Sequence, residues 1–212
     1  PEELVESGPA GGVAYARYLS KITGQKNIIH TDMGGTTFDA SIINNGEALI
    51  TYDYELEWEI PISIPMLDIR SVGAGGGSIA WVDTGGSLRV GPQSAGSNPG
   101  PACYALGGTQ ATVTDANFIL GRLNPTLGGK LSLDSKEAEL AVKRIADQLN
   151  INLLDTAEAI ISITCENMAQ AIKLVLTDRG RDTRDFVLAS FGGAGPMHAC
   201  QIAEALNIPL II

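Results

Sequence analysis

Short apolar segments separated by polar turns dominate the first quarter of the chain. Alternating apolar positions predict strands at about residues 27–31, 38–44 and 47–54. An Asn-Asn-Gly sequence at residues 44–46 is typical of a tight hairpin between the second and third strands. The pattern therefore predicts three consecutive antiparallel strands, with a glycine-containing turn between the first two.

The second half of the chain has apolar residues three and four positions apart, the spacing of helices that pack on a core. Asp134 and Glu137 form a capping-box-like start for one of these helices. The predicted helices cover residues 13–19, 114–123, 134–149, 155–179 and 196–206, and a buried strand covers residues 186–190. This alternation of helix and strand predicts an α/β fold.

The middle of the chain is rich in glycine and proline. Residues 60–65 alternate apolar side chains but contain two prolines, which predicts an edge strand or an extended connector. Residues 73–78 form a dense glycine loop, and residues 79–83 and 88–91 predict a hairpin turned at Gly-Gly. The irregular stretch at residues 92–108 has a length that is usually functional in a compact domain.

Composition narrows the class of protein. A formal net charge of −10 over 212 residues argues against nucleic acid and anionic membrane surfaces as partners. We find no run of about 18 apolar residues and no signal peptide, and we therefore expect no membrane span. Three widely spaced cysteines fit a reduced, cytoplasmic protein better than a disulfide framework. The chain has no initial methionine and stops within an apolar segment, which predicts a piece of a longer polypeptide.

The turn between the first two strands has the composition of a phosphate site. Gly34 and Gly35 can take positive φ and bring backbone N–H groups close to an anion. Thr36 and Thr37 add hydroxyl donors, and Asp32 can hold Mg²⁺ directly or through waters. The alternative for a bare Gly-Gly-Thr is a hairpin in which the glycines merely make the bend.

A second glycine turn lies some 150 residues further along the chain. Gly192, Gly193 and Gly195 follow the strand at residues 186–190 and precede a helix that begins at Pro196. Such a turn allows close backbone approach, and a helix N-terminus favours negative charge. Alone, it is more often a packing turn than a nucleotide site, but together the two turns favour a nucleotide.

The two turns resemble known motifs. The segment at residues 32–39 is similar to the second phosphate motif of the actin, sugar kinase and heat-shock ATPase superfamily, and residues 192–195 are similar to its adenosine motif. The resemblance is closer still to the hydantoinase A, 5-oxoprolinase and acetone carboxylase family. The matching segments are residues 7–12, 32–39, 73–83, 91–104, 112–123 and 191–199.

The resemblance implies a fold and a division into parts. In that family a complete subunit has two ribonuclease-H-like lobes with ATP between them, and this chain corresponds to the second lobe without its N-terminal partner lobe. We expect an α/β, ribonuclease-H-like lobe with a mixed five-stranded sheet. Residues 1–55 would form its first part with the phosphate hairpin, residues 56–131 an inserted glycine-rich small subdomain, and residues 132–212 its second part with the adenosine motif.

The resemblance also implies residue roles. Asp32 and Asp39 are the candidate catalytic residues: Asp32 as the Mg²⁺ ligand, and Asp39 either near the metal or ordering the turn. The expected contacts to the β- and γ-phosphates come from Gly34, Gly35, Thr36 and Thr37, and those to the adenosine and α-phosphate from Gly192, Gly193 and Gly195.

The implied activity is ATP-dependent opening of a cyclic amide, in which phosphorylation of the amide oxygen makes the carbon open to attack by water. No acid/base dyad for the hydrolysis is visible, which fits a hydantoinase-B-like companion subunit or domain that completes the reaction. ATP-dependent carboxylation of a ketone is the alternative enzyme activity, and a non-catalytic actin-like nucleotide switch is the alternative of another class.

Several other residues are weaker candidates. The glycine loop at residues 73–78 is either a substrate-side loop or a structural crossing. Asp68, Arg70 and Asp83 flank it and are candidate polar groups of the cleft. Asn167 and Lys173 approach the adenine side in one interpretation; they are surface or core residues in the other.

The remaining reactive side chains can be explained by structural roles as well as by catalytic ones. Asp115 is explained by a helix cap formed with its neighbour Thr114, with catalysis as the second interpretation. Cys103 without a histidine partner is expected to be a buried thiol. His198 and Cys200 lie two residues apart on a predicted helix, so they point away from each other, and with two histidines in the chain we expect no zinc site.

Overall fold

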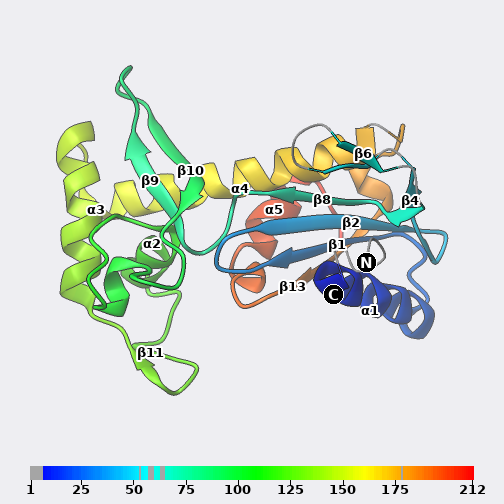
Figure 1. Ribbon diagram of the computed structural model, residues 1–212, viewed down its shortest axis with the longest axis horizontal. Coiled ribbons are helices and arrows are strands. Elements are labelled where there is room, and N and C mark those ends of the chain that lie inside the picture. Colours follow the sequence, from blue (N-terminus) through cyan, green and yellow to red (C-terminus); the bar gives the residue numbers. More distant parts are fainter. Residues whose placement is uncertain (1–6, 53, 57–59, 63–64, 178) are drawn as a thin grey trace.

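A mixed sheet is the centre of the computed structural model, which describes residues 7–52, 54–56, 60–62, 65–177 and 179–212 (Figure 1). Its strands are β1 (Ile28–Met33), β2 (Phe38–Asn44), β3 (Glu47–Ala48), β8 (Ile69–Val72) and β13 (Val187–Phe191). They are arranged in the order β13-β1-β2-β3, and β8 pairs with β2 beside β3. β1 runs antiparallel to β2 and parallel to β13, and Ile211 adds an isolated parallel bridge to Leu188.

The predicted third strand, residues 47–54, is wrong in extent. Only β3 pairs with the end of β2, because β8 occupies the rest of that edge from Phe38 to Ser41. The chain between them leaves the sheet at Leu49 and returns at Asp68, whose N–H donates to the Leu49 carbonyl at 2.9 Å. This excursion holds two small ladders: β4 (Ile50–Thr51) with β7 (Met66–Leu67), and β5 (Tyr54–Leu56) with β6 (Ile60–Ile62).

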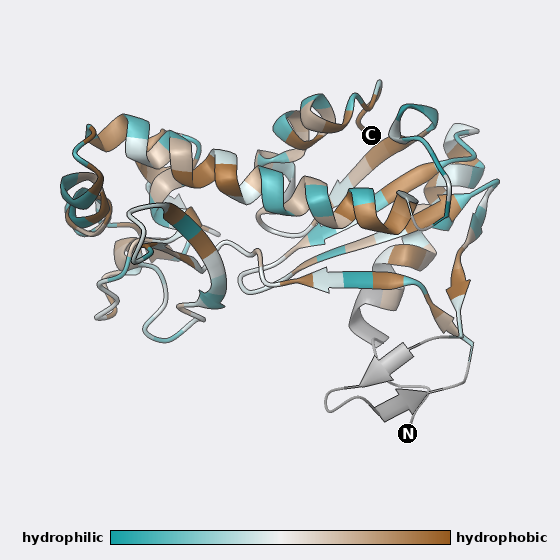
Figure 2. Ribbon diagram, turned by 90° about the horizontal axis from the view of Figure 1, so that it is seen from above, coloured by the Kyte–Doolittle hydropathy of each residue, from teal (hydrophilic) through white to brown (hydrophobic). Residues whose placement is uncertain are grey.

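Helices cover both faces of the sheet (Figures 1 and 2). α1 (Ser7–Thr23) packs with Val13 and Ala16 against apolar residues of one face. α4 (Leu153–Thr177) and α5 (Ala199–Leu206) bury the opposite face, where the larger core cluster lies. The alternation of strand residues between the two clusters explains the order α1, sheet, α4 and α5.

The segment between β8 and α4 extends the molecule away from the sheet, on the left in Figure 1. Its elements are β9 (Ser78–Val82), β10 (Leu88–Ser94), α2 (Val113–Ile119), β11 (Thr126–Leu127), β12 (Leu131–Ser132) and α3 (Ser135–Leu149). The β9–β10 hairpin confirms the prediction from residues 79–91. α4 runs along the length of both parts and packs on α2, α3 and β10.

Several helix boundaries differ from the predicted ones. α1 is longer than residues 13–19, and α4 begins two residues earlier than expected because Asn152 accepts from the N–H of Asp155. The predicted helix at residues 196–206 starts instead with a 3₁₀ turn, Gly195–Met197, and α5 begins only at Ala199. The second glycine turn is therefore followed by a tight 3₁₀ turn and not by an α-helix.

α4 is the one helix among the described residues that is long and apolar enough to cross a membrane by length and composition. Of its most apolar window, 56% is buried inside the protein. The buried side chains include Ile160, Ile161, Met168 and Ile172, all within the larger core cluster. This burial accounts for the apolar composition of the helix.

Candidate functional site

The hairpin turn (residues 34–37) connects β1 to β2 and is exposed. The Gly34 N–H donates to the Thr37 carbonyl at 3.0 Å and closes the turn. The N–H groups of Gly35, Thr36 and Thr37 have no acceptor among the described residues. Three main-chain donors at the end of the sheet thus have no partner within the described part of the protein.

Positive φ is not used in this turn, which corrects the expectation for Gly34 and Gly35. Neither residue has a positive φ. A Cβ on Gly35 would meet nothing within 4 Å, and one on Gly34 would meet only the Thr37 carbonyl at 4.0 Å. The protein itself therefore has room for a side chain at both positions.

The glycine turn (residues 192–195) lies directly against the end of β1. Gly192 has φ +83°, and a Cβ there would stand 2.4 Å from Asp32 Oδ1 and 2.3 Å from the Met33 carbonyl. The Ala194 N–H donates to the same Met33 carbonyl at 3.2 Å. The structure thus brings the two motifs together, because β1 and β13 are parallel neighbours that end side by side.

Asp32 and Asp39 lie opposite each other in the antiparallel register of β1 and β2. Opposed residues share a face of the sheet, and two like charges there are unfavourable unless a cation or a donor offsets them. Asp39 accepts a short hydrogen bond from the Ser71 hydroxyl. Asp32 and Asp39 are the carboxylates of this junction, and the described residues contain no cluster of three or more His, Cys, Asp or Glu side chains that could hold a metal ion.

A cavity of about 270 Å³ opens where the two turns meet. Its main-chain wall comes from both motifs: Gly34 and Gly35 on one side, Gly193 and Ala194 on the other. The remaining lining residues are Gly76, Tyr104, Thr114, Leu123, Leu127 and Met197. Sequence reasoning missed the side chains of this wall, because they come from four separated segments and only Met197 adjoins a motif.

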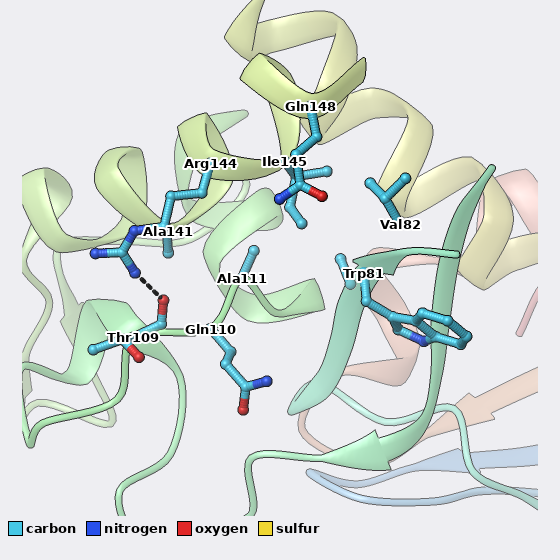
Figure 3. A pocket seen from close by; sticks show the side chains of 10 residues that line it. Trp81, Val82, Thr109, Gln110, Ala111, Ala141, Arg144, Ile145 and Gln148 are labelled. Atoms are coloured by element: carbon cyan, nitrogen blue, oxygen red, sulfur yellow. Dashed lines mark hydrogen bonds between the residues drawn. The ribbon is translucent and has the colours of Figure 1, made fainter. Parts of the chain in front are cut away.

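A second cavity, of about 290 Å³, lies between β9, residues 109–111 and α3 (Figure 3). Arg144 crosses one side of it and donates to the Thr109 carbonyl at 2.8 Å. None of the site residues predicted from the sequence lines this cavity. The two motifs therefore line the first cavity and not this one.

Asp115 is a structural carboxylate. It is fully buried and accepts from the N–H groups of Ala102, Cys103 and Thr112 and from the Thr112 hydroxyl, at 2.7 to 3.2 Å. The cap of α2 is Thr112, not Thr114 as expected, and Asp115 completes its capping box. All four donors are internal, which favours the helix-cap interpretation over catalysis.

The buried thiols and His198 are held as neutral groups near pH 7. Cys103 is buried as expected, and burial raises the pKa of its thiol well above its usual range. His198 lies 3.5 Å from Cys165 Sγ and 3.3 Å from Asn117 Nδ2, while Cys200 is exposed. Burial lowers the pKa of His198 to about 4 and raises the pKa of Cys165 to about 11, so both groups are neutral near pH 7.

The other candidate polar groups do not line the cavity of about 270 Å³ at the two turns, called the motif cavity below. Asp68 is buried and forms ion pairs with Arg179 and Arg70 at the start of β8. Asp83 accepts from the main chain of its own hairpin turn and from Arg89, and these bonds lower its pKa. Asn167 donates to the main chain of β10, and neither it nor Lys173 lines the cavity.

His30 is a buried residue on the same face of β1 as Asp32. Its Nδ1 lies 3.1 Å from the Ser41 hydroxyl, and its Nε2 has no partner among the described residues. A Cβ on Gly12 of α1 would lie 2.5 Å from that Nε2, so the glycine makes room for the ring. Burial lowers the pKa of His30 to about 4, although the nearby charge of Asp39 opposes the shift.

Comparison with known proteins gives consistent matches. A sequence profile described as hydantoinase/oxoprolinase matches residues 1–212. The acetophenone carboxylase gamma subunit of Aromatoleum aromaticum is 45% identical over 90% of this chain, which spans 27% of that relative.

Two solved structures superpose closely on the chain. The ATP-dependent caprolactamase from Pseudomonas jessenii has a TM-score of 0.89 and 40% identity over 97% of this chain and 30% of its own. A nucleotide-free acetone carboxylase has a TM-score of 0.88 and 35% identity over 97% and 29%. The mixed α/β fold is therefore that of the corresponding part of both enzymes, and the chain spans about a third of the length of these relatives.

Proposed function

Because the chain belongs to the hydantoinase/oxoprolinase family, we propose that it is the ATP-binding part of an ATP-dependent enzyme that opens cyclic amides. The observation that carries the proposal is the meeting of the hairpin turn and the glycine turn at one cavity. Unpaired main-chain donors line one side of the junction and a carboxylate pair lies beside it. Donors with an adjacent carboxylate are what a Mg²⁺–triphosphate requires.

The nucleotide would lie across both turns. The β- and γ-phosphates would accept from the N–H groups and hydroxyls of the hairpin turn, and Asp32, with Asp39 beside it, would hold Mg²⁺, which neutralises phosphate charge when bound. The glycine turn would let the adenosine and α-phosphate lie against its main chain. Tyr104 and Met197 offer an apolar surface in the same cavity for a flat base.

The chemistry assigned to this part is phosphoryl transfer. The γ-phosphoryl group passes from ATP to the amide oxygen, so that one P–O bond breaks, another forms and ADP is released. Water then adds to the activated carbon and the ring C–N bond opens to leave an acyl phosphate, and a second water hydrolyses the acyl phosphate to a carboxylate and inorganic phosphate. Residues of this chain position the phosphates in the first step, and a hydantoinase-B-like companion subunit or domain would complete the second.

The arrangement of strands supports a ribonuclease-H-like lobe. β2 runs antiparallel to β1 on one side and to β3 and β8 on the other. β13 pairs parallel to β1, and the bridge at Ile211 adds a parallel partner to β13. We propose the division into residues 1–55, 56–131 and 132–212, with a second lobe, supplied from outside this chain, closing over the nucleotide.

A ketone carboxylase is the second candidate, because the acetone carboxylase structure matches nearly as well as the caprolactamase structure. The experiment measures ADP release by the intact protein with each substrate class. Release stimulated by lactams or hydantoins supports the hydrolase, and release stimulated by acetone or acetophenone with bicarbonate supports the carboxylase. Binding of ATP without stimulated release by either class would refute both and favour a nucleotide switch.

A further inference from the structure

The glycine loop (residues 73–78) packs main chain against main chain on the hairpin turn. The Gly76 N–H donates to the Gly34 carbonyl at 3.0 Å, and the Gly77 N–H donates to the Gly35 carbonyl at 2.6 Å. The carbonyls of Gly34 and Gly35 are thereby directed toward the loop. With these two carbonyls engaged by the loop, the N–H groups of Gly35, Thr36 and Thr37 are the unpaired main-chain donors of the turn among the described residues.

The contact is too close for a side chain. A Cβ on Gly75 would lie 2.5 Å from the Gly35 carbonyl carbon and 2.5 Å from the Thr36 nitrogen. Because both are main-chain atoms, no rotamer change can relieve the clash. The loop therefore defines where the main chain of the hairpin turn can stand.

The loop is itself held by α2. The N–H and the hydroxyl of Thr114 both donate to the Gly76 carbonyl at 2.8 Å. Thr114 adjoins Asp115, whose buried carboxylate fixes the start of α2 through four donors. Hydrogen bonds thus connect Thr114 through Gly76 to Gly34, and the covalent neighbour of Thr114, Asp115, fixes the start of α2.

We propose that the glycine loop and Thr114 form a positioning clamp for the hairpin turn. The clamp holds the open N–H groups where the terminal phosphate is bound, and it makes their position depend on the placement of α2 relative to the sheet. The inference rests on the proposed function, since it assigns to the clamp the recognition of the γ-phosphate. The clamp differs from a substrate-binding loop because the hydrogen bonds of the glycine loop join it to the hairpin turn and to α2.

The first test adds one methyl group to the clamp in the intact protein. Gly75→Ala should displace the hairpin turn and weaken ATP binding by about tenfold or more, the equivalent of one good hydrogen bond to a charged group, and it should weaken ADP binding by a smaller factor, because ADP lacks the γ-phosphate contacts. Gly85→Ala, in the β9–β10 turn, is the matched control and should bind both nucleotides as the parent does. Equal loss of ATP and ADP, or no loss of either, overturns the proposal.

The second test keeps the proposal falsifiable if Gly75→Ala does not fold. Thr114→Val removes the hydroxyl that donates to Gly76 and retains the shape of the side chain, whereas Thr114→Ser retains the hydroxyl. We expect a several-fold loss of ATP affinity in the valine variant, a smaller loss of ADP affinity, and recovery of both in the serine variant. A valine variant that binds ATP as tightly as the parent contradicts the clamp.

Nucleotide binding by the parent protein distinguishes failure of the proposed function from failure of the clamp. If it binds neither ATP nor ADP by calorimetry, the proposed function fails and the clamp falls with it. If it binds both with the same affinities as the Gly75→Ala and Thr114→Val variants, the nucleotide site stands and the clamp alone is refuted.

Discussion

Adjacent glycines in the glycine turn should respond in opposite ways to the same methyl group. Gly192 has φ +83°, and its Cβ would stand 2.3 Å from the Met33 carbonyl. The left-handed conformation costs about 1–2 kcal/mol for a residue with a Cβ, and forced repacking adds about 1–3 kcal/mol. Gly192→Ala should therefore lower the free energy of unfolding by about 2–5 kcal/mol.

Gly193 has no positive φ, a Cβ there would meet nothing within 4 Å, and it lines the motif cavity. Gly193→Ala should leave the free energy of unfolding within about 1 kcal/mol of the parent. Its methyl group would project into the space assigned to the nucleotide and should weaken ATP binding by at least about tenfold.

The assay pairs urea unfolding with ATP titration on the parent and both variants. The expected outcome is a stability loss confined to Gly192→Ala and an affinity loss without destabilisation in Gly193→Ala. Equal stability of the two variants would refute the steric reading of the turn. Unchanged ATP affinity in the second variant would show that the nucleotide does not lie against Gly193.

Three further predictions concern buried groups. Cys200 alone among the three thiols should react with a disulfide reagent near pH 8 in the native chain, and all three should react after unfolding, as counted spectrophotometrically. Stability to urea should fall between pH 6.5 and about 4, because unfolding lets His30 and His198 take up protons that the folded state excludes, at up to about 1.4 kcal/mol per pH unit for each histidine; a flat profile would contradict their burial as neutral groups. Asp115→Asn should cost at least about 2 kcal/mol of unfolding free energy, since an amide donor replaces one charged acceptor, whereas Asp134→Asn, at an exposed N-cap, should change stability little.

Local patterns predicted the parts of the fold that local chemistry determines. The hairpin signal at residues 44–46, the cap at Asp134 and the glycine-turned hairpin at β9–β10 all appear where they were expected. The predicted extent of the third strand was wrong because β8, a segment more than twenty residues away, shares the edge of β2 with which it pairs. Nothing in the pattern of residues 47–54 records that competition for one strand edge.

The candidate site also has a part that the sequence predicted and a part that it did not. The two turns were found from sequence because Asp32 and the glycines and threonines of the hairpin turn lie within six consecutive residues, and the three glycines of the glycine turn lie within four. The apolar wall was not found, because Tyr104, Leu123 and Leu127 are brought to the cavity by a long loop and a small ladder outside the sheet. The glycine loop was recognised as unusual, yet its role depends on hydrogen bonds to a turn about forty residues earlier.

The glycines themselves divide into two groups by what requires them. Gly75 and Gly192 are required by the protein, because a side chain at either position would collide with main-chain atoms. Gly34, Gly35 and Gly193 are not: none has a positive φ, and a Cβ there would meet no protein atom closer than 4.0 Å. All three of these unneeded glycines line the same cavity. Nothing inside the fold requires these three positions to lack a side chain. A ligand that lies directly against the backbone of two facing turns does require it. This physical argument for the nucleotide is independent of the resemblance between sequences.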